Sequence, residues 1–369
     1  MIKILQINSY SGIGGGEMVM FNIIESLNNS FDFVIVAPKG EFLGKYREMN
    51  LKIYQICRQS NFSNILKIRK IVKREKPKII HCHGTRAAFW SRLAVLGLKN
   101  RPRTVYTLHG FHLIRKSGYI KWLFVLIEKL LNYWTDVLVC VSEADKKAVL
   151  EYKTISPKKV VVVKNGIDIE KFQVNPDLVK RTREDLNLQN KFVLISIGRL
   201  HPPKDFPTLL EAIKIIRENY SEIWKNLILL IVGDGPLREL LEDKVRNLGI
   251  FSYIYFLGFR EDVPLLINLS DLVILSTKWE GLPLVPIEAG AGRKPVIASD
   301  VDGVRETIID RKTGYLFKSA QDLAEKILAI YENEDLRKEM GENGYQFVLK
   351  NFNREKMVEE YKKLYQFAK

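Results

Sequence analysis

The sequence predicts an α/β protein made of two Rossmann-like halves, each with a parallel sheet between helices. Short runs rich in Val, Ile and Leu alternate with amphipathic helical segments, which is the βαβ rhythm of a parallel sheet. The rhythm stops at a polar segment near residues 170–190 and then starts again. The 369 residues, 46% of them hydrophobic, are enough for two buried cores.

In the first half, strand-like runs occupy residues 2–8, 31–38, 78–84, 103–110, 136–142 and 159–168. Helical patterns at residues 17–29 and 64–76 lie between them. The apolar window 119–142 contains four charged residues, which are too many for a membrane-spanning helix. We expect this window to form a helix that leads into a buried strand.

In the second half, strand-like runs occupy residues 191–200, 227–235, 253–259, 271–277 and 294–300. The last helical pattern, residues 353–369, fits either half by its composition. The predicted halves therefore meet near residues 170–190.

Three cysteines, Cys57, Cys82 and Cys140, form no C-x-x-C pair, so a reducing compartment without a disulfide framework is expected. The first residues lack the long apolar core and the cleavage site of a signal peptide. Both features favour a cytoplasmic protein.

The net charge of +15 comes from the first half alone, because residues 1–170 hold 28 Lys and Arg against 13 Asp and Glu. No acidic residue lies between Glu75 and Glu128, and ten basic residues do, among them Arg92, Arg101 and Arg103. Such a field favours an anionic partner, and a merely solubilising surface is the alternative. Nucleic acid is disfavoured because aromatic and basic residues do not interleave as they do in stacking platforms.

A glycine-rich loop follows the first strand and opens a helix, where backbone N–H groups would approach a phosphate. The dinucleotide fingerprint G-x-G-x-x-G fails here, because Glu17 occupies the third glycine position after Gly12 and Gly14. Lys39, and no acid, follows the second strand. A nicotinamide cofactor is therefore not expected, and the loop is also compatible with a plain tight turn.

Arg199 and Lys204 follow the first strand of the second half, on a loop that begins with glycine. A guanidinium and an ammonium group at this place suit a diphosphate. Two solvated side chains are the alternative.

Glu280 and Glu288 flank an apolar run that contains Pro283 and Pro286. We expect Glu280 in a loop after a strand and Glu288 in the first turn of the next helix. Carboxylates there would accept hydrogen bonds from sugar or ribose hydroxyls. Alternatively, Glu288 caps its own helix.

The run His81, Cys82 and His83 contains typical metal ligands. Neighbouring residues of a strand point to opposite faces, so His81 and His83 share a face without Cys82. Histidines of an acceptor pocket or of the core are favoured over a metal site.

A series of motifs across nearly the whole chain resembles the retaining GT-B glycosyltransferases of family 4, most closely those of bacterial surface-polysaccharide synthesis. The motifs are GGGE (14–17), CHG (82–84), TLHGFH (107–112), VSEADK (141–146), KNGID (164–168), GRLHPPKD (198–205), VGDGPLRELLE (232–242), FLGFREDV (256–263) and EGLPLVPIEAGAGRKPVIASD (280–300). The resemblance implies an acceptor domain at residues 1–172, joined by a returning helix at about 352–369. It also implies a donor domain at residues 173–351.

The resemblance also implies the roles of single residues. Catalytic roles fall on His109, Arg199, Lys204 and Glu280. Donor binding falls on Gly15, Gly16, Arg199, Lys204, Arg260, Gly281, Leu282, Leu284, Val285 and Glu288. Acceptor binding falls on Glu17, His83 and Arg115.

The implied reaction moves a sugar from a nucleotide-sugar, expected to be a UDP-sugar, to a lipid-linked saccharide with retention of configuration. No cofactor and no metal are expected, and no motif residue is an obvious covalent nucleophile. The implied location is the inner face of the cell membrane, with the protein attached peripherally to its anionic surface. The basic residues expected to surround the TLHGFH loop at this surface are Arg101, Arg103, Arg115, Lys116 and Lys121. A nucleotide-sugar epimerase of the same architecture is the alternative function.

Overall fold

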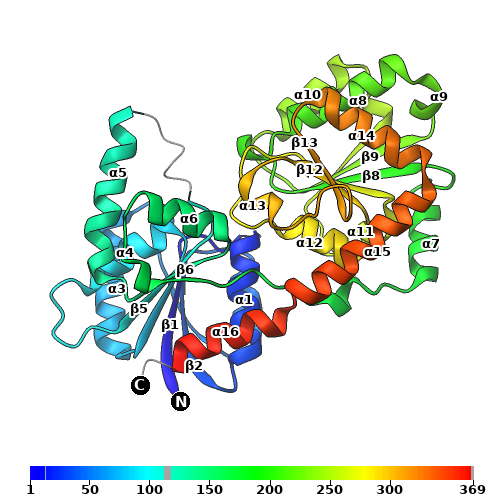
Figure 1. Ribbon diagram of the computed structural model, residues 1–369. Helices are drawn as coiled ribbons and strands as arrows, with labels where there is room; N and C mark the ends of the chain where they lie inside the picture. The colour runs from blue at the N-terminus through cyan, green and yellow to red at the C-terminus, as the bar shows by residue number, and fades with distance from the viewer. Residues whose placement is uncertain (13, 112–117, 367–369) are drawn as a thin grey trace. The chain divides into compact units, whose positions relative to one another are not determined.

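The computed structural model describes residues 1–12, 14–111 and 118–366, and it consists of two compact units (Figure 1). The first unit is Met1–Gly166 together with the C-terminal segment that starts at Arg354. The second unit is Ile167–Asn353. Each unit has its own sheet and its own core.

The first unit contains a seven-stranded parallel sheet in the order β3-β2-β1-β4-β5-β6-β7. Its strands are β1 (Ile2–Asn8), β2 (Phe31–Ala37), β3 (Lys52–Gln55), β4 (Ile79–His83), β5 (Arg103–Leu108), β6 (Val137–Cys140) and β7 (Val160–Val162). The strand order reverses between β1 and β4. Loops that leave these two strands run to opposite faces, so the carboxyl ends of β1 and β4 are where such a sheet binds ligands.

Helices cover both faces of this sheet. The helices of the first unit are α1 (Gly15–Leu27), α2 (Phe42–Glu48), α3 (Asn61–Glu75), α4 (Thr85–Val95), α5 (Gly118–Leu131), α6 (Glu143–Glu151) and α16 (Arg354–Gln366). Apolar side chains of α3, α4 and α6 form the core on one face. Those of α1, α2 and α16 form the core on the other face.

The second unit contains a six-stranded parallel sheet in the order β10-β9-β8-β11-β12-β13. Its strands are β8 (Phe192–Ile197), β9 (Leu227–Val232), β10 (Ile254–Gly258), β11 (Leu272–Leu275), β12 (Val296–Ser299) and β13 (Gly314–Phe317). Here the order reverses between β8 and β11, which makes the carboxyl ends of these strands the expected ligand site.

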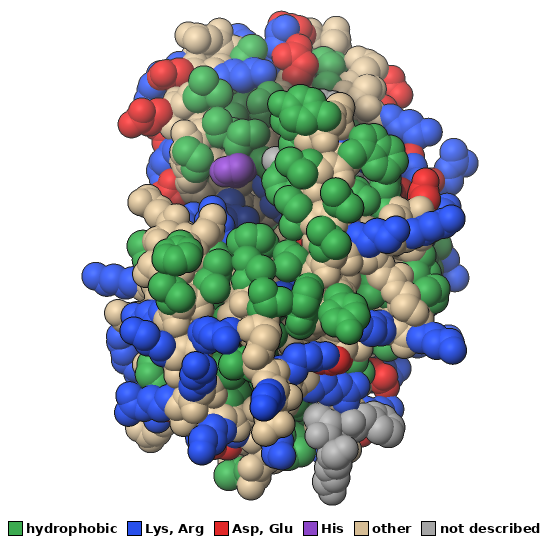
Figure 2. Space-filling model, turned by 90° about the vertical axis from the view of Figure 1, so that its left-hand side faces the viewer, with side chains coloured by type: hydrophobic (Ala, Val, Ile, Leu, Met, Phe, Trp, Pro, Cys, Tyr) green, Lys and Arg blue, Asp and Glu red, His purple; other side chains and the backbone are tan. Residues whose placement is uncertain are grey.

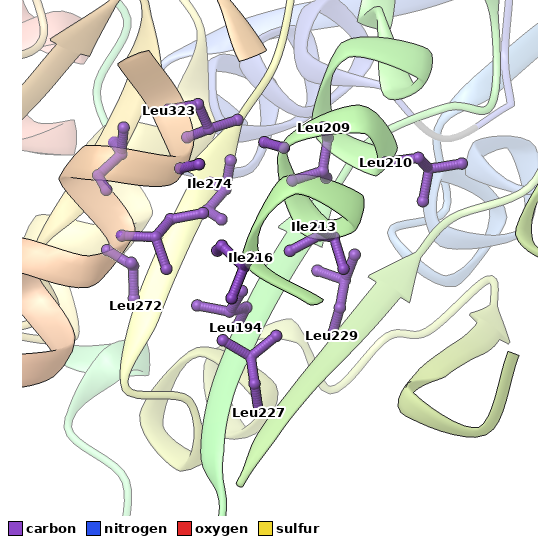
Figure 3. Close-up of a cluster of buried hydrophobic side chains, with 14 of the residues drawn as sticks. Leu194, Leu209, Leu210, Ile213, Ile216, Leu227, Leu229, Leu272, Ile274 and Leu323 are labelled. Carbon is purple, nitrogen blue, oxygen red and sulfur yellow. The ribbon is translucent and has the colours of Figure 1, made fainter. Parts of the chain in front are cut away.

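The helices of the second unit are α7 (Pro176–Asp185), α8 (Phe206–Asn219), α9 (Ser221–Trp224), α10 (Arg238–Asn247), α11 (Val263–Leu269), α12 (Leu284–Ala291), α13 (Asp302–Arg305), α14 (Ala320–Glu332) and α15 (Glu334–Asn351). Figure 3 shows Leu209, Ile213 and Ile216 of α8 packed over strand residues. Burying such aliphatic side chains contributes about 1.5 to 3 kcal/mol each.

The structure adds elements that the sequence pattern did not predict. Strand β3 is polar and partly exposed, and β13 begins with a glycine, so neither has the continuous apolar run of a central strand. The polar segment near residues 170–190 contains α7, which has no buried residue. An exposed helix lacks the apolar stripe by which helices are recognised.

The last helix, α16, belongs to the first unit, as the resemblance implied. It packs beside α1, and its Tyr361 and Tyr365 are fully buried against the first sheet. The aromatic ring of Tyr365 lies 5.4 Å from that of Phe31, measured between ring centroids. Helix α16 therefore completes the core of the N-terminal half.

Helix α5 is fixed to α4 by a buried ion pair. The Arg92 guanidinium is fully buried and donates to both carboxylate oxygens of Glu128 at 2.9 Å, and to Asn132 Oδ1 at 2.9 Å. The prediction that Arg92 belongs to an exposed basic surface was wrong, because this arginine is enclosed between the two helices. In the described part of the chain, no helix combines the length and apolar content needed to cross a membrane.

The first prediction concerns this pair. Glu128→Ala leaves a buried arginine without its counter-charge, which costs about 3 to 5 kcal/mol of unfolding free energy. Urea denaturation measures the loss. Lys129→Ala changes the next, exposed residue of α5 and should shift stability by no more than about 0.5 kcal/mol. A loss below about 1 kcal/mol for Glu128→Ala would show that the pair does not fix α5.

Candidate functional site

In the second unit, the predicted site residues gather at the carboxyl edge of the sheet. Lys204 follows β8, Arg260 follows β10, and Glu280 follows β11. Because β8 and β11 are neighbours at the point where the strand order reverses, their loops border one crevice.

Lys204 and Glu280 form an ion pair across this crevice. The Lys204 ammonium donates to Glu280 Oε1 at 2.5 Å, and both side chains are largely buried. The two loops are also joined through their backbones. Ser276 Oγ donates to the Lys204 carbonyl at 3.1 Å, and the Lys278 N–H donates to the Pro203 carbonyl at 2.8 Å. The cation and the carboxylate are therefore held in place by their loops before any ligand arrives.

Gly233 allows the loop after β8 to lie close to its neighbour. Gly233 has φ +127°, and a Cβ there would lie 2.1 Å from the Gly198 carbonyl oxygen. The aliphatic stem of Lys204 passes over Gly198, 3.5 Å from where a Cβ would stand. A side chain at Gly233 would displace the loop that carries Lys204, whereas a Cβ at Gly198 would only contact the Lys204 stem.

Glu288 lies on α12, in its second turn, because the helix begins four residues earlier at Leu284. The prediction that Glu288 lies in the first turn was therefore wrong. Little of the side chain is exposed to solvent. Burial raises the pKa of Glu288 to about 7, and the nearby positive charge of Lys204 lowers it in part. The position in the second turn also excludes a capping role, so Glu288 is a partly buried carboxylate that its own helix does not use.

Helix α12 is held against α15 by glycines. A Cβ on Gly290 would lie 2.7 Å from Val348 and 3.0 Å from the Gly344 carbonyl oxygen. This close contact fixes the position of the helix that carries Glu288. The buried backbone around Gly281 is equally crowded, because a Cβ on Gly303 would lie 2.1 Å from the Gly281 carbonyl oxygen.

The N-terminus of α12 presents backbone donors. Leu284 and Val285 are its first two residues, and N–H groups in a first helical turn have no intrahelical acceptor. Pro286, the third residue, lacks an N–H that would have been unused within the helix anyway. Leu282 is buried, so its side chain serves the core.

The remaining predicted donor residues lie on exposed loops. Arg199 is exposed on the loop after β8. Arg260 donates to Asp262 at 2.8 and 2.5 Å, and this carboxylate raises the pKa of Arg260. The Arg260–Asp262 pair therefore shapes the loop between β10 and α11, beside the exposed ring of Phe259.

In the first unit, the glycine loop leads into α1. A Cβ on Gly16 would lie 3.2 Å from the His109 ring, so this glycine leaves room for the histidine. Glu17 accepts a hydrogen bond from Asn8 Nδ2 at 3.2 Å, and its carboxylate lies 2.4 Å from where a Cβ of Gly14 would stand. A carboxylate therefore occupies part of the space at the N-terminus of α1, next to Gly15.

His83 and His109 lie against one another at the carboxyl end of β4. His83 Nδ1 is 3.3 Å from His109 Nε2, and the two rings stack at an angle of 17°. His83 is 2% exposed, so its side chain presents almost no surface to an acceptor. Arg115, the third predicted acceptor residue, lies outside the described residues, as does Lys116.

The predicted facing of the β4 residues is confirmed. Cys82 packs in the core under α3 and α4, whereas His81 and His83 lie on the face under α16. No three His, Cys, Asp or Glu side chains among the described residues form a group that could hold a metal ion.

Sequence reasoning missed the partners of these histidines. Gln6 Oε1 lies 3.0 Å from His83 Nε2, and the Tyr365 hydroxyl lies 2.7 Å from His81 Nδ1. The available signal was Gln6 within the apolar run 4–7 of β1, because a buried polar side chain requires a partner.

Comparison with known proteins matches each of the two units to a glycosyltransferase family. A model of Glycosyltransferase Family 4 matches residues 13–171, and a model of Glycosyl transferases group 1 matches residues 179–347. Together these matches span both sheets of the protein.

Relatives match the chain over nearly its full length. The chain is 28% identical to an Escherichia coli UDP-Gal:alpha-D-GlcNAc-diphosphoundecaprenol alpha-1,3-galactosyltransferase, over 99% of this chain and 96% of the relative. It is 26% identical to the capsular polysaccharide biosynthesis glycosyltransferase CapM of Staphylococcus aureus, over 91% of this chain and 90% of the relative. These relatives give no support to an epimerase.

Solved structures show the same fold. The Anabaena protein HepE in complex with UDP-glucose superposes with a TM-score of 0.88 at 20% identity, covering the whole of both chains. A glycosyltransferase from Rickettsia africae superposes with a TM-score of 0.82 at 22% identity, covering 100% of this chain and 98% of that one. The predicted fold is confirmed, and the chain belongs to the family 4 glycosyltransferases of the GT-B fold.

Proposed function

We propose that this glycosyltransferase moves a sugar from a UDP-sugar to a lipid-linked saccharide, with retention of configuration and without a metal ion. The observation that carries the proposal is the Lys204–Glu280 ion pair, with Glu288 nearby, at the reversal point of the second sheet. This site offers a cation for a diphosphate and carboxylates for hydroxyl groups.

The diphosphate is the anionic part of the donor. Lys204, with Arg199 on the same loop, would neutralise the charge that grows on it as the glycosidic bond breaks. The Leu284 and Val285 N–H groups at the α12 N-terminus would add hydrogen bonds and the favourable end of the helix dipole. A metal ion would be unnecessary if these groups carry the charge.

The carboxylates would bind the hydroxyl groups of the donor. Glu280, paired with Lys204, is assigned to the transferred sugar, and Glu288 to the ribose. The backbone from Phe259 to Asp262, at the end of β10, is assigned to the base. In the first unit, His109 is assigned to the sugar at the reacting carbon.

The proposed reaction is a front-face displacement. The bond between the anomeric carbon and the diphosphate oxygen breaks, and the acceptor oxygen bonds to that carbon from the same face. The acceptor proton passes to the departing phosphate oxygen, so all atoms and charges balance. Support for retention comes from the family resemblance and from the lack of an obvious nucleophile among the motif residues.

Two observations support UDP and a lipid-linked acceptor. The E. coli relative is named for UDP-Gal and for an acceptor on diphosphoundecaprenol. In this chain, α5 presents an apolar stripe to solvent, in which Tyr119 is 81% and Trp122 63% exposed. The stripe continues through Leu123, Leu126 and Leu130. A stripe of this kind suits the boundary of a lipid bilayer.

A basic groove lies at the amino edge of the first sheet, toward which α5 runs. Its volume is about 1060 Å³, and its cations are Lys73, Lys76, Lys78, Lys99, Arg101 and Arg103. Figure 2 looks at the α5 side of the first unit and shows Lys and Arg side chains around a hydrophobic area. Apolar and cationic side chains on one side of the unit suit an anionic membrane surface.

The predicted placement of two of these arginines was wrong. Arg101 and Arg103 were expected around the TLHGFH loop, but Arg103 begins β5 and His109 follows its end. The Arg101 guanidinium is also paired with Asp136, at 2.6 and 2.7 Å. The basic groove therefore belongs to the membrane surface that we propose and not to the reaction centre.

The donor is tested with a panel of UDP-, GDP- and ADP-sugars, by nucleotide release in the presence of an undecaprenyl-diphosphate-linked sugar. Lys204→Met should lower the rate by about a hundredfold or more, because it removes charge stabilisation from the leaving group. Lys225→Met, at an exposed lysine of the same unit, should have no effect. EDTA should change little. Release without an acceptor, or a rate that EDTA abolishes and a divalent cation restores, would contradict the proposal.

The carboxylate Glu288 links function to stability. Its pKa of about 7 lies above the ordinary value of 4.5, so the folded state loses stability as pH rises from 4.5 to 7. Glu288→Gln should therefore raise the unfolding free energy at pH 8 by about 1 to 3 kcal/mol and leave it unchanged at pH 4. The same variant should bind the donor more weakly, since it loses a charged hydrogen-bond acceptor.

Denaturation at both pH values and calorimetric titration of the donor measure these two effects. Glu239→Gln changes an exposed carboxylate on α10 and serves as the control. A Glu288→Gln variant that keeps full donor affinity would remove Glu288 from the proposed site.

Membrane attachment is tested by sedimentation with vesicles that contain phosphatidylglycerol. Changing Lys76, Lys78 and Lys99 to Gln should weaken binding by about 3 kcal/mol, or roughly a hundredfold, since each cation contributes about 1 kcal/mol. Trp122→Ser with Leu126→Ser should remove the binding that remains at high salt. Changing Lys225, Lys312 and Lys338 of the second unit to Gln should have little effect. Failure of the wild-type protein to bind these vesicles at low salt would refute the membrane proposal.

A further inference from the structure

A chain of buried polar side chains crosses the face of the first sheet under α16. We call it the polar chain, and its members are Gln6, His81, His83, Thr107, Tyr361 and Tyr365. Each member is at most 2% exposed, and the rest of this face is an apolar core. Buried polar groups are costly unless all are hydrogen-bonded, and here every member has a partner.

The polar chain has one branch toward the reaction centre and one that runs through Thr107 to Tyr361. Toward the centre, Gln6 Nε2 donates to the Tyr365 hydroxyl at 3.0 Å, and Gln6 Oε1 lies 3.0 Å from His83 Nε2. On the other branch, His81 contacts Tyr365 at 2.7 Å and Thr107 at 2.7 Å. The Tyr361 hydroxyl, 3.2 Å from Thr107 Oγ1, lies at the far end of this branch.

The orientation of the Gln6 amide determines where the protons lie. Because Gln6 Oε1 accepts, His83 must carry its proton on Nε2, which leaves Nδ1 as an acceptor. Because Tyr365 accepts from Gln6, its own proton is available to His81 Nδ1, and the 2.7 Å distance is typical of a hydroxyl donor. His81 then donates from Nε2 to Thr107.

The same logic extends to His109. His83 Nδ1 is an acceptor, so the contact at 3.3 Å requires a proton on His109 Nε2. Burial lowers the pKa of His81 to about 3 and that of His83 well below its ordinary value, so both rings are neutral. Gly16 on the other side of His109 leaves space for the ring in this orientation.

We propose that Gln6, His83 and Tyr365 are positioning residues, which hold His109 as the tautomer protonated on Nε2 and make α16 part of the support of the reaction centre. The catalytic consequence rests on the proposed function, in which His109 lies at the reacting sugar. In this tautomer the Nε2 proton of His109 is directed at His83, so a contact between this ring and a sugar hydroxyl would use Nδ1. The chain's last helix thus has a role beyond closing the core.

The tautomers are measured directly by NMR of the full-length protein labelled with ¹⁵N-histidine, at pH 7 and without ligand. The sequence has five histidines, so five ring systems appear, and single His→Gln replacements assign them. We expect the protons of His81, His83 and His109 on Nε2. A wild-type His109 protonated on Nδ1 would overturn the proposal.

Variants test whether the polar chain sets this state. Gln6→Leu removes the acceptor of His83 and should shift His83 and His109 toward a mixture of tautomers. Tyr365→Phe keeps the ring packing against Phe31 and Phe33, and it should cause the same shift if Gln6→Leu does not fold. Tyr361→Phe is the matched control, because its hydroxyl contacts Thr107 and makes no direct hydrogen bond with Gln6 or His83. An unchanged His109 tautomer in the folded Gln6→Leu or Tyr365→Phe protein would also overturn the proposal.

Kinetics separate this proposal from the proposed function. Tyr365→Phe should lower kcat by about tenfold or more and leave donor affinity within twofold, whereas Tyr361→Phe should change neither. A shifted tautomer with an unchanged kcat would overturn the catalytic part of the proposal. Full activity of His109→Asn would contradict the proposed function of His109, while the NMR result would still decide the positioning role.

Discussion

The ion pair between Lys204 and Glu280 is the interaction on which the candidate donor site depends. It joins the loops that leave β8 and β11, which diverge to opposite faces of the second sheet. A largely buried cation and carboxylate are costly to leave apart, so without a ligand each satisfies the other. A nucleotide-sugar carries replacements for both partners, since its diphosphate suits the cation and its hydroxyls suit the carboxylate. Exchange of partners thus gives the free site a defined shape without leaving an unpaired charge.

The first sheet also has polar side chains at the point where its strand order reverses, and these need hydrogen-bond partners as well. At its reversal point, between β1 and β4, the buried side chains of the polar chain are connected by hydrogen bonds instead of ion pairs. Tyr361 and Tyr365 of α16 supply part of these bonds, although they lie more than 250 residues from Thr107 and His81 in sequence. The return of the last helix is therefore required both by the apolar core and by the polar chain. In the second unit, by contrast, a charged pair meets at the edge of the sheet, next to an apolar core.

The sequence predicts the fold well, because buried parallel strands are continuous apolar runs and nearly all of them were recognised. Edge strands β3 and β13 escape this signal, since one is polar and the other begins with glycine. The loops that carry Lys204 and Glu280 were located by their place after strands, but their pairing was not, because it depends on strand order. Glu288 was assigned to the wrong turn, since two prolines obscured the start of α12. Arg101 and Arg103 are near the TLHGFH loop in sequence, but β5 separates them from it in space. They lie at the start of this strand and the loop follows its end, so their prediction was wrong. The polar chain joins residues from both ends of the protein, and no local pattern predicts such contacts.

The most direct measurement of the central claim compares two affinities of the Glu280→Gln protein by calorimetry, one for UDP and one for a UDP-sugar that the enzyme uses. If Lys204 leaves Glu280 for the diphosphate, removing the carboxylate's charge frees the cation and reduces repulsion of the phosphates. The account therefore predicts tighter UDP binding than in the wild type, together with a loss of the preference for the UDP-sugar over UDP. Unchanged affinity for both ligands would show that the ion pair does not exchange partners with the donor, and would contradict the account.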